Sequence, residues 1–209
     1  MRIRWNTVRE AAPLGAGLLA LVLTLHPACV AAQPAAAKPA DVVVHARDLP
    51  SSALSEFRVA KEAGTAGGLV FTPQGGDELD PPPENDPHVT IKANVQAGVP
   101  YRLWIHMKVG APKGKSKANL LFAQFTGAVD AAGKETLSPR TGSYLSMHGP
   151  AKPGWVWVGS DAAKLITFKS GGEITIRLQG GAEGVGFDQV ILSPARFLEK
   201  APTDAVVAK

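Results

Sequence analysis

One aspartate near the end of the chain lies at the start of a segment that looks like a buried strand, where a carboxylate needs a partner. The stretch GGAEGVGFDQVILSP (180–194) runs from a glycine-rich turn, through Asp188, into a short apolar strand. If Val190 and Leu192 point into a core, the two-residue period of a strand sends Asp188 inward as well. A buried carboxylate without a partner is costly. We therefore expect a cation, a basic side chain or several backbone N–H donors beside Asp188.

A tryptophan in the segment YRLWIHMKV (101–109) is a second chemical candidate. Trp104 alternates with the aliphatic residues of this segment. The residues on its own face are Arg102, His106 and Lys108. An indole exposed among such donors suits sugar recognition, because its plane stacks on the C–H face of a pyranose. The alternative is that a loop covers Trp104 and that the stems of Arg102 and Lys108 flank it.

Two further tryptophans lie in the strand candidate WVWV (155–158). Trp155 and Trp157 are two residues apart, so they share one face while the valines share the other. If the valines are core, the indoles form an outward platform, and Trp155 is the better ligand-facing candidate because it begins the strand. If the indoles are core, they serve packing. Tyr144, in a long loop, and Asn119, which opens NLLFAQF, are expected to add hydrogen bonds to a ligand.

Known catalytic motifs are absent from the sequence. It contains no G-x-S-x-G, H-E-x-x-H or Walker segment. Ser143, Ser146 and His148 are close together in one loop, but no acidic residue evidently orients the histidine. No pair of carboxylates stands out as a glycosidase pair. We therefore expect a protein that is not an enzyme.

Alternation of apolar and polar residues is the strongest structural signal in the chain. It is clear in segments 88–95, 101–109 and 173–179. Shorter strand candidates are DVVVH, FRVA, GLVF, NLLFAQF, WVWV and KLITF. About eight to ten strands, with two long loops (72–87 and 130–154), predict an all-β protein with an antiparallel β-sandwich.

The first 32 residues have the order of a secretory signal peptide. A head with three arginines precedes an apolar core and then small residues before Gln33. An uncleaved anchor is the alternative, although the apolar run is short for a membrane span. Residues 33–40 predict a flexible linker, 41–198 one domain and 199–209 a flexible tail. We expect export to the periplasm or the outside of the cell, with no membrane attachment after cleavage.

Cleavage of residues 1–32 would also change the charge and the thiol content. Three arginines and one glutamate leave with the signal peptide, so the formal net charge falls from +4 to +2. So small a charge gives no electrostatic argument for a nucleic-acid partner. The only cysteine, Cys29, leaves as well. A disulfide is then excluded, and a packed core or a metal must stabilise the exported domain.

Several segments occur in an order that resembles one group of proteins. They are FRVAKEAGTAGG, AGVPYRLWIHMK, NLLFAQFTGAVDAAG, GWVW, GGEITIRLQGG and GVGFDQVILSP. From residue 41 to 198 the chain resembles secreted galactose-binding-like jelly-roll modules, and it is similar to carbohydrate-binding modules of families 6 and 35. The resemblance implies a jelly roll that binds a glycan or polysaccharide without catalysis.

The resemblance also bears on Asp188. In such modules the matching acidic residue of the last strand often helps to hold a structural calcium ion, together with a carboxylate from the first strand. Here the segment DVVVHARDL (41–49) offers Asp48 for that role. The alternative is that Asp188 caps a turn through the backbone of GVGF (184–187) or forms an ion pair.

The expected function is therefore carbohydrate binding by an exported module. Two alternatives belong to other classes. One is a β-sandwich that binds an envelope or extracellular protein, or has a structural role in the envelope, without binding sugar. The other is a hydrolase with an unrecognised site.

Overall fold

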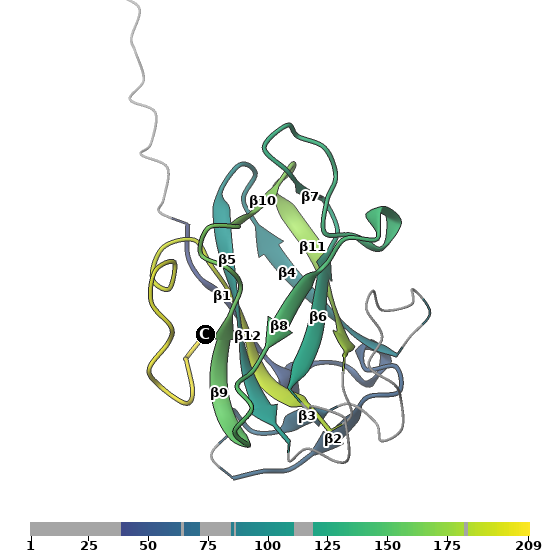
Figure 1. Ribbon diagram of the computed structural model, residues 1–209, viewed down its shortest axis with the longest axis vertical. Coiled ribbons are helices and arrows are strands. Elements are labelled where there is room, and N and C mark those ends of the chain that lie inside the picture. Colours follow the sequence, from purple (N-terminus) through teal and green to yellow (C-terminus); the bar gives the residue numbers. More distant parts are fainter. Residues whose placement is uncertain (1–38, 64, 72–84, 86, 111–118, 182–183) are drawn as a thin grey trace, which may run out of the picture. The chain divides into compact units, whose positions relative to one another are not determined.

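The computed structural model describes residues 39–209, except residues 64, 72–84, 86, 111–118 and 182–183 (Figure 1). The predicted signal peptide (1–32) and residues 33–38 of the predicted linker lie outside the described residues. In the described part of the chain, no helix is long and apolar enough to cross a membrane.

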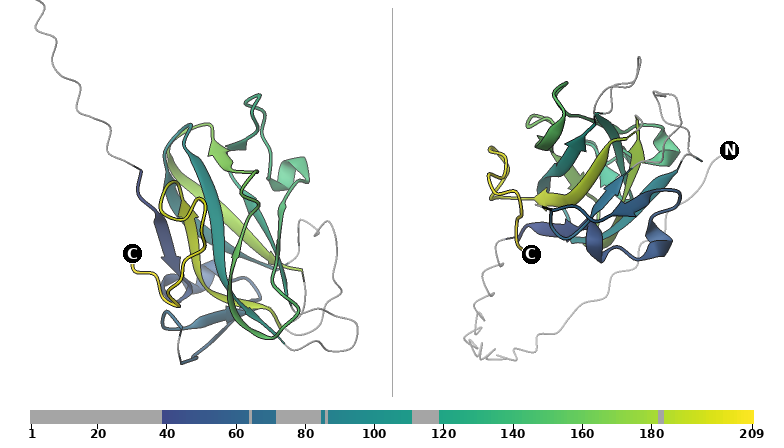
Figure 2. Two further views of the ribbon diagram at one scale, coloured as in Figure 1. Left: turned by 60° about the vertical axis from the view of Figure 1, so that its left-hand side comes forward. Right: turned by 90° about the horizontal axis from the view of Figure 1, so that it is seen from below.

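Among the described residues, the larger of two antiparallel sheets has eight strands (Figures 1 and 2). They are β1 (Val42–His45), β2 (Arg58–Ala60), β3 (Leu69–Phe71), β5 (Pro100–Val109), β7 (Ala128–Val129), β9 (Gly154–Gly159), β10 (Ile166–Phe168) and β12 (Gly186–Ser193). β5 and β12 pair along most of their lengths at its centre. The other edge of β12 pairs with β3 and β1, and the other edge of β5 pairs with β10 and β9.

The smaller sheet has four strands in the order β4-β11-β6-β8. Their bounds are β4 (His88–Val95), β6 (Leu120–Phe125), β8 (Leu145–His148) and β11 (Gly172–Gly180). Three 3-10 turns complete the described elements: η1 (Ala46–Asp48), η2 (Ser51–Ala53) and η3 (Pro139–Thr141). The predicted antiparallel β-sandwich is confirmed. β7 and β8 were not predicted, and β8 lies inside the segment read as a long polar loop.

The core lies between the two sheets and follows the predicted alternation. Leu103, Ile105 and Met107 of β5 are all fully buried in it. The apolar rows of β4 and β11 face them from the smaller sheet, and Ile91 and Leu178 are likewise fully buried. Burial of these aliphatic side chains is the main favourable term for the fold.

The alternation of β12 is interrupted at Asp188. The pairing with β5 shifts by one residue between Phe187 and Gln189, so Asp188 is the extra residue of a β-bulge. Phe187 and Val190 both pack in the main core. Asp188 instead forms a hydrogen bond with His106, on the outer face of the larger sheet. The prediction that Asp188 shares the inward face of Val190 was wrong, because one extra residue reverses the alternation.

The C-terminal segment (199–209) lies along the outer face of the larger sheet (yellow in Figures 1 and 2). The side chain of Gln189 donates to the carbonyl of Ala205 at 2.7 Å and accepts from the N–H of Val207 at 2.8 Å. Nε2 of His45 lies 2.9 Å from the carbonyl oxygen of Val207, whose side chain is buried. The prediction of a flexible tail is therefore corrected to a segment docked by hydrogen bonds.

Candidate functional site

Two indoles and one imidazole stack on the outer face of the larger sheet. β5 and β9 pair with His106 opposite Trp157 and Lys108 opposite Trp155. The centroid of the His106 ring lies 4.8 Å from that of Trp155, with an angle of 21° between the planes. It lies 4.7 Å from that of Trp157, with an angle of 33°. Because the valines of β9 pack in or against the main core, both indoles lie on the opposite, outward face.

Asp188 fixes the position of the imidazole. Its Oδ1 lies 2.7 Å from Nδ1 of His106, and its Oδ2 accepts the backbone N–H of Ala66 at 2.8 Å. Asp188 is completely buried and His106 is only 4% exposed. The described residues thus give Asp188 a titratable side-chain partner and a backbone donor, which is how a buried carboxyl group is satisfied.

Glu62 connects the stack to the surface. Its Oε1 accepts the indole N–H of Trp155 at 3.1 Å, and its Oε2 lies 2.6 Å from Nζ of Lys108. The ammonium of Lys108, and after it the indole N–H, holds the pKa of the Glu62 carboxyl below its ordinary value, against the opposing effect of burial. Trp155 is therefore fixed at one face by His106 and at its N–H edge by Glu62.

This arrangement suits binding through an aromatic surface. Trp155 is half-buried, so part of the residue stays open to solvent although His106 covers one face of its ring. The side chains of Lys108 and Glu62 beside it are 39% and 26% exposed. Among the described residues, the hydrogen bond recorded for the ring of His106 is the one to Asp188.

Trp104 lies on the same sheet face but under a cover. Its indole N–H donates to the carbonyl of Phe197 at 2.7 Å, and the guanidinium of Arg102 lies 4.3 Å from its ring centroid. It is 5% exposed and packs with Ile191, Phe197 and Val207. The exposed, ligand-facing alternative for Trp104 was wrong, and the structure shows the covered alternative, because the end of the chain lies over the indole.

Tyr144 and Asn119 belong to the other sheet. The ring of Tyr144 packs edge-to-face on Phe122 of β6, with centroids 5.1 Å apart. The amide of Asn119 donates to the carbonyl of Gly149 at 2.8 Å, just before β6 begins. The structure therefore does not bring Tyr144 and Asn119 together with the tryptophans of β9.

The two carboxylates considered for a calcium ion have separate protein partners. Asp48, in η1, lies 2.9 Å from Nζ of Lys209 and 3.5 Å from Nε of Arg47, and Lys209 lowers its pKa. Both oxygens of Asp188 face nitrogen atoms. No group of three or more His, Cys, Asp or Glu in the described part of the chain could hold a metal. These surroundings do not fit calcium, which takes six to eight oxygen ligands.

Sequence reasoning missed His106, Glu62 and Lys108 as members of the site. The alternation of β5 already placed His106 and Lys108 on the outer face, and an antiparallel partner carrying WVWV would bring indoles beside them. No local pattern marks Glu62, because its contacts to Lys108 and Trp155 come from distant parts of the chain.

Comparisons with known proteins give similarities among solved structures. No protein-family model matches the chain, and no curated protein matches its sequence. A family 6 carbohydrate-binding module of a Cellvibrio mixtus lichenase, solved with cellotriose, has a TM-score of 0.45 and 12% identity, over 74% of this chain and 97% of that one.

Two similar structures belong to the same family. The C-terminal family 6 module of a Zobellia galactanivorans laminarinase has a TM-score of 0.46 and 12% identity, over 73% of this chain and 98% of that one. A Clostridium stercorarium module solved with cellobiose has a TM-score of 0.42 and 14% identity, over 73% and 93%.

Proposed function

We propose that the protein binds a carbohydrate through the indole of Trp155. The observation that carries this proposal is the half-buried indole, held by His106 on one face and by Glu62 at its N–H edge. A fixed aromatic ring loses little conformational freedom on binding, and its open surface can stack on the C–H face of a sugar ring. The partly exposed Glu62 and Lys108 supply an acceptor and a donor for sugar hydroxyls.

The proposed role is retention of the sugar without turnover. We expect modest affinity for each site, because the aromatic surface is only partly exposed and the ordering of the ligand offsets much of the contact energy. Trp157 contributes less to the ligand than Trp155, because Trp157 also packs against the cluster of Trp104 and Val207 and donates its N–H to the carbonyl of Asp204 at 2.9 Å, beneath the end of the chain. Calcium is not part of this proposal.

We also propose that the protein is exported. The support is the order of basic, apolar and small residues in segment 1–32. Expression of the full chain in a bacterial host, followed by N-terminal sequencing of the protein in each cell fraction, tests this. We expect the periplasmic or extracellular form to begin at Gln33. A protein that keeps Met1 and stays in the cytoplasm or membrane would contradict it.

The sugar site is tested by a glycan array followed by titration calorimetry with the best oligosaccharide. Trp155→Ala is expected to weaken binding roughly tenfold, which corresponds to one lost aromatic contact of about 1–1.5 kcal/mol. Trp155→Phe keeps a ring and should retain part of the affinity. Circular dichroism and melting curves establish that both variants are folded.

Tyr144→Ala is the matched control, because it removes a half-buried aromatic ring from the other sheet. We expect it to leave sugar binding unchanged. Loss of binding in Tyr144→Ala but not in Trp155→Ala would place the ligand on the smaller sheet and reject the Trp155 site. No retention of any glycan would reject the sugar-binding function, and release of reducing sugar would show an enzyme instead.

A further inference from the structure

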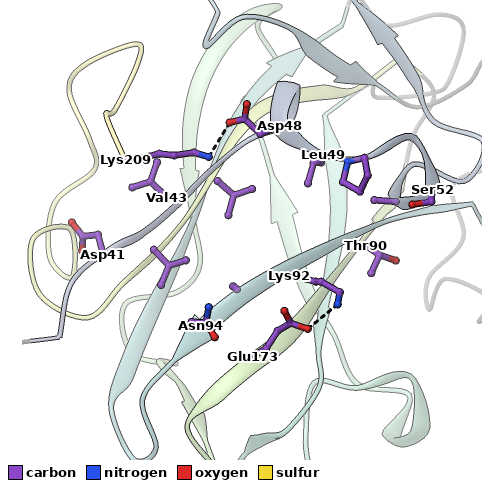
Figure 3. Close-up of a pocket in the computed structure, with 15 residues that line it drawn as sticks. Asp41, Val43, Asp48, Leu49, Ser52, Thr90, Lys92, Asn94, Glu173 and Lys209 are labelled. Atoms are coloured by element: carbon purple, nitrogen blue, oxygen red, sulfur yellow. Dashed lines mark hydrogen bonds and ion pairs between the residues drawn. The ribbon is translucent and has the colours of Figure 1, made fainter.

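A groove runs between the edge strands of the two sheets, away from the stacked rings. It has a volume of about 720 Å³ and lies between β1 of the larger sheet and β4 of the smaller one (Figure 3). Its apolar lining includes Val42, Val44, Leu49, Pro50 and Ala93. None of the described residues that line it is aromatic. The groove therefore lacks the stacking surface on which sugar recognition depends.

Both strands that border the groove have an open edge. In the described part of the chain, β1 pairs only with β12, and β4 pairs only with β11. No other backbone hydrogen bond among the described residues involves the four residues of β1. In an antiparallel pair, alternate N–H and C=O groups point away from the partner strand. β1 therefore presents backbone donors and acceptors toward the groove side that a further strand could use.

β1 packs on both of its faces although it lies at an edge. Val42 and Val44 pack against the main core, and Val43 packs against the cluster formed with the C-terminal segment. All three valines remain half-buried, so they still have apolar surface to cover. β-branched side chains are stiff and favour an extended backbone. The edge is thus already in the conformation that strand addition requires, which lowers the entropic cost of binding.

The charges around the groove favour a basic partner. Two ion pairs flank it, Lys92 with Glu173 at 2.8 Å and Lys209 with Asp48 at 2.9 Å (Figure 3). The carboxylate of Asp41, just before β1, accepts the hydroxyl of Ser193 at 2.6 Å and has no cationic partner among the described residues. Within the described part of the chain, one negative charge at the beginning of the open edge is therefore uncompensated.

We propose that this groove binds an extended segment of a partner polypeptide, which adds to the open edge of β1. The segment places alternate apolar side chains on the valine-lined floor and a lysine or arginine beside Asp41. Main-chain hydrogen bonds supply the affinity, and the side chains supply the register, as in strand addition generally. This interaction goes beyond the proposed sugar binding and uses none of its residues.

Two synthetic probe peptides test the proposal. They are acetyl-Lys-Val-Thr-Val-Thr-Val-amide and acetyl-Val-Thr-Val-Thr-Val-Lys-amide, which cover both strand directions. Each is titrated into ¹⁵N-labelled protein, and amide chemical shifts are followed. We expect one peptide to shift the amides of β1 and of residues 90–94. N-methylation of alternate residues on its bonding edge should weaken binding about tenfold, because several main-chain hydrogen bonds are lost together.

A charge exchange tests the role of Asp41. Asp41→Asn keeps an acceptor for Ser193 and should weaken the lysine peptide roughly two- to fivefold, as expected for an exposed ion pair. Asp41→Lys should reverse the preference, so that a peptide with glutamate in place of lysine binds better than the original. Glu199→Gln removes an exposed acid that does not line the groove and should change neither titration.

Several results would overturn the proposal. One is the absence of shifts at β1 with either peptide at millimolar concentration, and another is equal binding of the N-methylated peptide. Shifts at β1 that grow with protein concentration alone would assign the edge to a second copy of this chain. Shifts at β1 caused by an oligosaccharide would assign the groove to sugar. Because Trp155→Ala leaves the groove intact, its effect on sugar binding is read separately from every one of these outcomes.

Discussion

Removal of the Asp188 side chain is expected to destabilise the protein strongly. Asp188→Ala leaves two buried groups without a partner, Nδ1 of His106 and the N–H of Ala66. Each such group costs about 1–3 kcal/mol, so the free energy of unfolding should fall by about 2–6 kcal/mol. That is a large part of the total for a domain, which is about 5–15 kcal/mol. The measurement is urea denaturation followed by tryptophan fluorescence and far-ultraviolet circular dichroism.

Asp188→Asn is the matched variant because it has nearly the same shape. Its amide oxygen can still accept the N–H of Ala66, while its NH₂ group faces His106. We therefore expect the smaller loss of about 1–3 kcal/mol that one impaired hydrogen bond produces. The near-ultraviolet dichroism of the stacked rings should change in both variants. If Asp188→Ala lost less than about 1 kcal/mol, the two hydrogen bonds would not have the energetic role assigned to them.

Four further predictions concern other parts of the structure. A chain ending at Glu199 loses the hydrogen bonds and apolar burial of the docked segment, so its free energy of unfolding should fall by about 2–5 kcal/mol and its tryptophan fluorescence should shift to longer wavelength. Gly159→Ala places a Cβ 2.5 Å from the ring of Trp104 and should cost about 1–3 kcal/mol in urea denaturation. The pKa of the Glu62 carboxyl is lowered chiefly by Lys108, so the ionised Glu62 stabilises the folded protein fully above the ordinary glutamate pKa. This stabilisation is lost as the pH falls through the lowered pKa. Wild type should therefore lose more stability than Lys108→Met between about pH 5 and about pH 3. Addition of EDTA should leave the melting temperature unchanged, because both carboxylates considered for calcium have protein partners.

Matched variants separate these effects from general damage. Gly68→Ala meets its nearest atoms only at 3.7 and 3.8 Å and should be tolerated, unlike Gly159→Ala. Lys209→Ala removes only an exposed ion pair and should leave the free energy of unfolding nearly unchanged, unlike the truncation. Wild-type stability of the truncated protein would contradict the docking of the C-terminal segment. Equal acid sensitivity of Lys108→Met and wild type would contradict the effect of Lys108 on Glu62. A melting temperature lowered by EDTA would contradict the absence of a stabilising metal.

The regular parts of the fold could be predicted because they repeat. Strict alternation in segment 88–95 predicted β4 with its observed bounds, and the aliphatic row at 103–107 predicted the inward face of β5. In β4 a single face is buried, and the period of two records that burial directly in the sequence. In β5 the outer face is covered as well, but the aliphatic row still marks the inward face. Elements with few residues, such as β7 (Ala128–Val129), are too short to show a period.

The site was less predictable because contacts between distant residues define it. Gln189 recognises backbone atoms of residues 205 and 207, and such side chain-to-backbone contacts impose no pattern on the tail. The exclusion of Trp104 from solvent follows from that docking, so it was not visible either. Glu62 finds Trp155 across 93 positions of the chain. For Trp155 the sequence left two orientations open, and the packing of the β9 valines in or against the main core selects the outward one.

The bulge in β12 has a consequence for how this chain tolerates insertions and deletions. Phe187, Gln189 and Val190 would form an uninterrupted ladder if residue 188 were simply omitted, since both flanking stretches keep their phase relative to the core. Asp188 is thus an additional residue relative to the regular pairing of β12 with β5. Omission of that one residue removes the bulge together with the anchor of the imidazole, whereas Asp188→Ala removes the anchor and keeps the bulge.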